Sequence, residues 1–166
     1  MDQRLFWAMN SLSKRTDLIN YLMILVSNRV RYVYLFVLLF FWFKNRSVTI
    51  HALVSAAASL IISYIIRLFS FRPRPFVKSR VGILIPSKRN SSFPSKHTLL
   101  AFAVSATISF YHRTTGAVLT GLSTLTGLSR IWVGHHYPSD IIGSALIGSF
   151  ISLAARFLGN DSGSDA

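Results

Sequence analysis

The sequence contains no cysteine and no glutamate. Without a thiol, a cysteine nucleophile, a disulfide and a cysteine-based zinc site are all excluded. Four of the five aspartates lie near the termini, and only Asp140 lies inside the apolar body of the chain. Sites for Mg²⁺ or Ca²⁺ need several protein oxygens, which one interior carboxylate does not supply. Any chemistry must therefore use His, Arg, Lys, Ser and this single Asp.

Charge is scarce but strongly one-sided. Of the 166 residues, 51% are hydrophobic and 14% are charged, and 18 Lys and Arg against 5 Asp give a net charge of +13. An average soluble domain is about a quarter charged, so the composition argues against an ordinary cytosolic globule. It also argues against a disordered basic tail, which would be polar. The length indicates one domain. A low charge content with a strong excess of positive charge fits a small membrane protein that binds an anion.

Apolar runs predict the fold class, an all-α polytopic bundle of about five to six transmembrane helices. About 20 apolar residues cross the hydrocarbon core as a helix, and residues 48–66 match this best, with no formal charge. The candidate spans are residues 32–43, 48–66, 98–111, 114–133 and 141–158. Several of them are short, so helices buried in a soluble core are the alternative.

The segments outside these spans have weaker patterns. Leu5, Phe6, Met9 and Leu12 form a short amphipathic N-terminal helix suited to the membrane interface. Residues 18–26 are apolar but short, and are expected to be a half-span or a sixth helix. Residues 1–158 form a single integral-membrane domain in this interpretation. Residues 159–166, rich in Gly, Ser and Asp, are expected to be a disordered tail.

Five spans fix which loops share a side of the membrane. Residues 44–47 and 112–113 fall on one side with the C-terminus, and residues 67–96 and 134–139 fall on the other. Cytoplasmic loops favour Lys and Arg, and the first side satisfies this rule. The second side carries more positive charge still, which we assign to a binding site. We therefore expect a multi-pass protein of the cell membrane whose site faces the extracytoplasmic side.

The long loop is basic throughout and contains no acid. Its eight cations are Arg67, Arg72, Arg74, Lys78, Arg80, Lys88, Arg89 and Lys96. Such a cluster repels itself unless it binds an anion, and the planar fork of Arg matches phosphate oxygens. Arg67 ends a span and Arg74 is held between two prolines, so both suit a phosphate clamp. For Lys78, Arg80, Lys88 and Arg89 the alternative is a rim attracted to anionic headgroups.

Two further stretches carry histidines beside helix starts. Residues 93–97 enter the span that begins near residue 98, where free backbone N–H groups favour phosphate. In residues 129–140, Pro138 suits a first helical turn and Asp140 falls within that turn. A carboxylate four residues after His136 is expected to bond one ring nitrogen and leave the other as a nucleophile. A single membrane-embedded His is otherwise more often a packed residue.

Together these residues resemble the three-part signature of the type-2 phosphatidic acid phosphatase superfamily. The matching motifs are Arg67-x6-Arg74-Pro75, then Pro94-Ser95-Lys96-His97, then Ser129-Arg130-x5-His136-x3-Asp140. Residues 72–77 and 129–138 are most similar to the BcrC type, the bacterial undecaprenyl-diphosphate phosphatases tied to bacitracin resistance. Two positions depart from the signature. Arg67 replaces a Lys, and Lys96 replaces a Gly or Asp, which leaves substrate preference open.

The resemblance implies phosphoryl transfer through a phosphohistidine, with no metal and no cofactor. His136 would be the nucleophile, Asp140 its orienting acid, and His97 the general acid and then the general base. The phosphate-binding residues implied are Arg67, Arg74, Ser95, Lys96 and Arg130. We read His135 as structural and assign no function to His51 or His112.

The implied substrate is undecaprenyl diphosphate, whose product would sustain recycling of the cell-wall lipid carrier. Phosphatidylglycerophosphate, phosphatidic acid and diacylglycerol diphosphate are alternatives that suit the same residues. A different class of function is a non-catalytic protein that binds anionic lipids, or a subunit of a bacitracin exporter. This alternative would explain the cations but not why His97, His136 and Asp140 occur at the motif positions. No nucleic-acid module is present, and the sequence predicts no oligomeric state.

Overall fold

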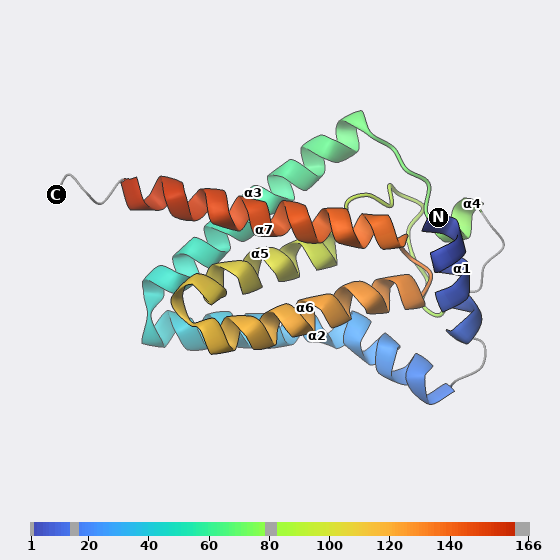
Figure 1. Cartoon of the computed structure of the whole chain (residues 1–166), viewed down its shortest axis with the longest axis horizontal. Helices are drawn as coiled ribbons and strands as arrows, with labels where there is room; N and C mark the ends of the chain where they lie inside the picture. The colour runs from blue at the N-terminus through green and yellow to red at the C-terminus, as the bar shows by residue number, and fades with distance from the viewer. Residues whose placement is uncertain (1, 14–16, 79–82, 162–166) are drawn as a thin grey trace.

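The computed structural model describes residues 2–13, 17–78 and 83–161, and these residues form seven helices and no strand (Figure 1). The basic-rim prediction for Arg80 and most of the predicted tail, residues 162–166, lie outside the described residues. The helices are α1 Asp2–Ser13, α2 Asp17–Lys44, α3 Arg46–Phe69, α4 Pro75–Lys78, α5 Lys96–Tyr111, α6 Arg113–Trp132 and α7 Pro138–Asp161.

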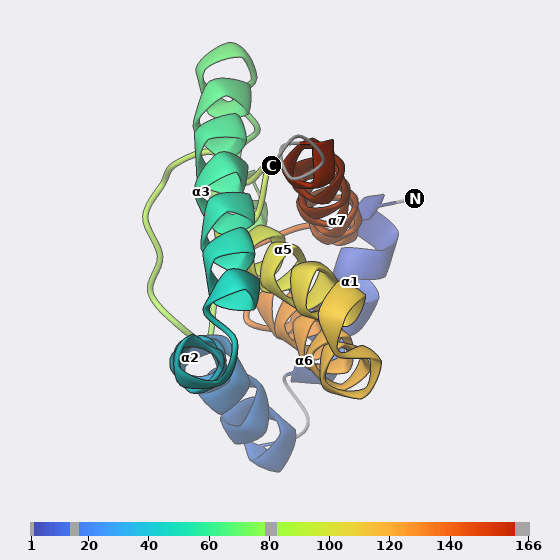
Figure 2. The same ribbon diagram turned by 90° about the vertical axis from the view of Figure 1, so that its left-hand side faces the viewer.

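The predicted all-helical membrane bundle is confirmed. Within the described residues, α2, α3 and α7 are long and apolar enough to cross a membrane. The shorter α5 has 16 residues, fewer than the about 20 that a span needs by itself. It is instead the central helix, with Leu99, Ala103 and Ile108 fully buried. Viewed along the bundle, α5 lies between α3, α6 and α7 (Figure 2).

Two predicted boundaries were wrong. Residues 18–26 and 32–43 belong to the single helix α2, of 28 residues, rather than to a half-span and a span. Four of the five residues between them are polar, but none is Pro or Gly, so nothing interrupts the helical hydrogen bonds. At the other end, α7 continues to Asp161, three residues into the predicted tail.

The arrangement of the loops follows the predicted alternation. The α2–α3 and α5–α6 turns lie at one end of the bundle, where α7 also ends (Figure 1). The α3–α5 connection and the α6–α7 turn lie at the opposite end, and α1 lies across it. We call this the site end, because it gathers all three motif segments.

Two apolar clusters hold this arrangement. The larger joins α2, α3, α5 and α6 through side chains such as Tyr34, Val48, Ile108 and Leu119. The smaller joins α1 to the α6–α7 region through Phe6, Ile131, Tyr137 and Ile141. Of the predicted amphipathic stretch, Phe6 is 2% exposed, whereas Leu5 and Leu12 are exposed. The N-terminal helix is therefore fixed against the turn that carries His136.

Candidate active site

Asp140 is the centre of the site end. It lies in the first turn of α7 with no exposed surface, and three donors surround its carboxylate. Oδ1 accepts a hydrogen bond from Arg72 at 2.5 Å, and Oδ2 accepts one from the Tyr137 backbone N–H at 2.9 Å. The Ser92 hydroxyl also donates to Oδ2. Since every partner is a donor, the carboxylate is held ionised.

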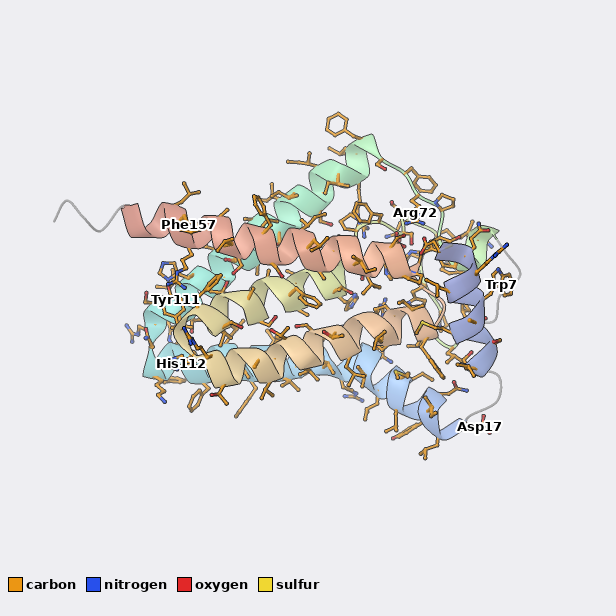
Figure 3. The ribbon with its side chains drawn as sticks, in the orientation of Figure 1. Trp7, Asp17, Arg72, Tyr111, His112 and Phe157 are labelled. Atoms are coloured by element: carbon orange, nitrogen blue, oxygen red, sulfur yellow. The ribbon has the colours of Figure 1, made fainter. Side chains whose placement is uncertain are left out.

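Arg72 extends this network to the N-terminal helix. Its guanidinium donates to Asp2 at 2.6 Å as well as to Asp140, and it lies 4.5 Å from the centre of the Tyr137 ring. Asp2 in turn accepts hydrogen bonds from the backbone and the hydroxyl of Ser139, at 3.0 and 2.6 Å. Figure 3 labels Arg72 beside α1 at the site end. Helix α1 is thus connected to the start of α7 by ionic hydrogen bonds.

The contact predicted between His136 and Asp140 is indirect. His136 Nδ1 is 3.8 Å from Asp140 Oδ2, which is too long for a hydrogen bond. Nδ1 instead lies 2.7 Å from the Ser92 carbonyl oxygen. A carbonyl only accepts, so Nδ1 carries the proton and Nε2 keeps a free electron pair. Ser92 therefore links the two residues, because its hydroxyl bonds Asp140 while its carbonyl bonds His136.

His136 is held in its neutral form. It is 2% exposed, and burial is the main reason that its pKa is lowered to about 4. The carboxylate of Asp140 opposes this shift, whereas Arg74 and Arg130 add to it. A neutral imidazole with a free Nε2 is the form that acts as a nucleophile.

A turn at Gly134 positions both histidines of the third motif. Gly134 has a φ of 88°, in the left-handed region that favours glycine, and it follows the last turn of α6. His135 Nε2 lies 2.7 Å from the Ile85 carbonyl, and its ring meets the edge of Phe76. These contacts support the prediction that His135 is structural.

Three arginines of the motif segments lie at the site end, and we call Arg67, Arg74 and Arg130 the arginine cradle. Arg67 donates to the Pro94 carbonyl at 2.6 Å, and Arg130 donates to the Ser27 hydroxyl at 2.6 Å. Arg74 bonds Asn90 and the Ser87 hydroxyl. Within the described residues, none of the three makes an ion pair with an acid.

The cradle has spare capacity for an anion. The Nε atoms of Arg67 and Arg130 are buried without a hydrogen-bond partner among the described residues. Burial, and then the positive charge of Arg67, lower the pKa of Arg74, whereas the carboxylate of Asp140 opposes this shift. Buried guanidinium donors of this kind bind phosphate oxygens strongly. No group of three or more metal-ligating side chains occurs in the described part of the chain.

The second motif opens α5. Ser95 is fully buried, and its N–H donates to the Ser144 hydroxyl at 2.7 Å. Its side chain does not cap the helix, so the first-turn N–H groups of α5 are not satisfied by it. Lys96 is exposed, and His97 is partly buried. The predicted phosphate contact of Lys96 therefore needs its side chain to reach the site from the surface.

His97 also lines an apolar cavity of about 330 Å³ between α2, α3 and α5. We call it the α2–α3 groove, and its walls include Val30 and Leu35 of α2 and Leu53 and Leu60 of α3. Helices α2 and α3 join at the far end of the bundle and diverge toward the site end (Figure 1). Leu35, Leu53 and Leu60 are exposed, so the groove opens sideways from the bundle.

The other histidines lie away from this site. His51 contacts Tyr111, with ring centres 5.8 Å apart, and His112 packs on Phe41. Tyr111 and His112 are labelled at the opposite end of the bundle from Arg72 (Figure 3). This placement agrees with assigning neither histidine a function.

The chain is similar to known proteins over most of its length. Residues 48–162 match the PAP2 superfamily. The chain is 37% identical to the undecaprenyl-diphosphatase BcrC of Bacillus subtilis, over 91% of this chain and 80% of that protein. It is 31% identical to the bacitracin transport permease protein BcrC of Bacillus licheniformis, over 89% of this chain and 75% of that protein.

Two solved structures share the fold. Aquifex aeolicus LpxE superposes with a TM-score of 0.81 and 25% identity, over 93% of this chain and 94% of that chain. A transmembrane PAP2 type phosphatidylglycerolphosphate phosphatase from Bacillus subtilis superposes with a TM-score of 0.75 and 16% identity, over 99% of this chain and 89% of that chain.

The buried histidines predict an acid-sensitive fold. Burial lowers the pKa of both His135 and His136 from 6.5 to about 4. Between pH 4 and pH 6.5 the unfolded chain binds more protons than the folded chain. The free energy of unfolding is therefore highest above about pH 6.5 and falls as the pH drops toward 4. We expect the unfolding midpoint in detergent to fall over this range.

The His135→Gln variant tests this cause, because glutamine can still donate to Ile85 but does not titrate. It should lose less of its unfolding midpoint on acidification than the unmodified protein. His51→Gln, at the opposite end, should leave the loss unchanged. Equal acid losses in His135→Gln and the unmodified protein would contradict the assignment.

Proposed function

Because this chain belongs to the PAP2 superfamily, we propose that it hydrolyses undecaprenyl diphosphate to undecaprenyl phosphate and inorganic phosphate. The observation that carries the proposal is the Ser92 carbonyl on His136 Nδ1, which leaves Nε2 unprotonated beside a cationic cradle. The 37% identical relative is named for this activity. A phosphatase of membrane lipids also accounts for a charge surplus concentrated at one end of an apolar bundle.

In the proposed reaction, His136 Nε2 attacks the terminal phosphorus and forms a P–N bond. The bond from that phosphorus to the bridging oxygen breaks, and His97 protonates this oxygen as it leaves with the lipid. His97 then removes a proton from water, which attacks the phosphohistidine. The P–N bond breaks, inorganic phosphate is released and His136 is regenerated. No step requires a metal.

The arginine cradle supplies the electrostatic part of this reaction. Phosphoryl transfer depends on positioning and on positive potential around the equatorial oxygens. Arg67, Arg74 and Arg130 would provide that potential, helped by Ser95 and the first N–H groups of α5. Lys96 would add a contact only when its exposed side chain turns inward.

The α2–α3 groove supports a lipid substrate. It is apolar, opens sideways from the bundle and meets the site at His97. A lipid chain would lie in it while the diphosphate reaches the cradle. Nothing in its wall measures chain length, so phosphatidylglycerophosphate, phosphatidic acid and diacylglycerol diphosphate are the competing substrates. A non-catalytic binder of anionic lipids would need neither the free Nε2 nor its link to Asp140.

We further propose that the site end faces the outside of the cell. Hydrolysis there would return the lipid carrier for cell-wall synthesis and remove the diphosphate form, which would confer resistance to bacitracin. Lys44, Arg46 and Arg113 at the opposite end would then satisfy the preference of cytoplasmic loops for positive charge.

The function is tested by phosphate release from purified protein in detergent with EDTA. We expect release from undecaprenyl diphosphate at a higher kcat/KM than from phosphatidylglycerophosphate, phosphatidic acid or diacylglycerol diphosphate. His136→Gln should reduce the rate by about 1,000-fold or more, because it removes the nucleophile, and His51→Gln should retain it. Full activity in His136→Gln would contradict the mechanism, and no release from any of the lipids would favour the binder.

The orientation is tested by cysteine labelling, since the chain has no cysteine of its own. Lys88 at the site end and Arg113 at the opposite end are both exposed. We expect a membrane-impermeant maleimide to label Lys88→Cys in intact cells and Arg113→Cys only after permeabilisation. The reverse pattern would place the site in the cytoplasm.

A further inference from the structure

Arg31 is a cation in a membrane helix that the reaction above does not use. It precedes Lys44, the end of α2, by 13 residues, or about 20 Å of helix. Among the described residues it makes no ion pair with an acid; its guanidinium lies 5.0 Å from the Tyr32 ring centre and 3.2 Å from the Tyr32 hydroxyl. An ionisable side chain at such a depth is costly and is usually retained for function.

The position of Arg31 relative to the cradle is fixed by α2. Ser27, one helical turn earlier, accepts the hydrogen bond from Arg130 at 2.6 Å. Residues four apart lie on the same face of a helix, and Ser27 and Arg31 both line the α2–α3 groove together with His97. Along α2, Ser27 at the cradle is therefore followed one turn later by Arg31, and then by Leu35 and Leu38 of the apolar wall.

A lipid diphosphate has the same order of groups. If the cradle holds the terminal phosphate, the bridging oxygen lies toward His97, which protonates it. The next group is the inner phosphate, which remains on the lipid as the leaving group. The chain follows into the groove. The inner phosphate therefore falls at the level of Arg31, the groove-lining residue with a permanent positive charge.

We propose that Arg31 binds the inner phosphate of the substrate and makes the site prefer lipid diphosphates to lipid monophosphates. This inference rests on the proposed phosphatase function. A monophosphate has no inner phosphate, so its leaving group is an alcohol with no negative charge for Arg31 to bind. The cradle cannot make this distinction, because it contacts the terminal phosphate that both classes share.

Two other cations offer comparisons. Arg29 is exposed on α2 but does not line the groove, since residues two apart point in nearly opposite directions on a helix. Lys96 is next to His97 and, like Arg31, is exposed, but it does not line the groove. Arg29→Gln is therefore the matched control, and Lys96→Gln tests the competing assignment.

The experiment compares kcat/KM for farnesyl diphosphate and farnesyl monophosphate, which differ only in the inner phosphate. In Arg31→Gln we expect kcat/KM for the diphosphate to fall by about tenfold or more, the usual effect of losing a hydrogen bond to a charged group. The monophosphate value should change little, and Arg31→Lys should restore part of the loss. Because the ratio of the two values does not depend on the folded fraction, poor folding would not imitate this result.

The outcomes separate this inference from the proposed function. An unchanged ratio in Arg31→Gln, or a loss of selectivity in Lys96→Gln instead, would overturn the role of Arg31 and leave the phosphatase intact. No phosphate release from either compound or from undecaprenyl diphosphate by the unmodified protein would remove the proposed function itself. If the unmodified protein cleaves only the diphosphate, the test uses kcat/KM for the diphosphate alone. This value should fall in Arg31→Gln but not in Arg29→Gln, and the two variants should have equal unfolding midpoints.

Discussion

The buried carboxylate of Asp140 is the interaction on which the site depends. Its donors come from the loop after α3, from the loop before α5 and from the α6–α7 turn. Through Arg72 it also reaches Asp2 of α1. Burying a charge costs free energy unless its partners are in place, so these four segments must pack together in the folded protein. The convergence of three motifs that are far apart in sequence follows from satisfying one acid.

The electrostatic design of the site is complementary to a phosphate. The only interior acid is satisfied by Arg72, whereas the arginines of the cradle have no acid of their own among the described residues. His136 is neutral and therefore does not add to the positive charge. An arriving phosphate would supply the missing negative charge and meet a nucleophile that needs no deprotonation. Since phosphoryl transfer relies mainly on positioning and potential, this arrangement suits the reaction without further groups.

Much of this could be predicted from the sequence, because spans and motif spacing are local patterns. The helical bundle, its loop sides and the gathering of the three motifs at one end follow from apolar runs and their alternation. The division of α2 was wrong, because polar residues within an apolar run do not stop a helix. The direct bond between His136 and Asp140 was also wrong, since a spacing of four residues across a turn does not fix side-chain geometry.

Other features of the site had no sequence signal. Ser92 binds His136 through its backbone carbonyl, which any residue possesses. Asp2 looked like one of several acids near a terminus, and its contact with Arg72 spans 70 residues. Ser27 and Arg31 lie on a helix before the first motif, so only the packing of α2 against its neighbouring helices places Ser27 beside Arg130 and Arg31 in the groove.

The central claim is that His136 carries the phosphoryl group between the two half-reactions. It is tested most directly by rapid quenching during turnover of undecaprenyl diphosphate that is radiolabelled in its terminal phosphate, followed by peptide mapping at alkaline pH. The account predicts an acid-labile, base-stable label on His136 that forms and decays at least as fast as phosphate is released. Turnover without label on His136, or with the label on another residue, would contradict it.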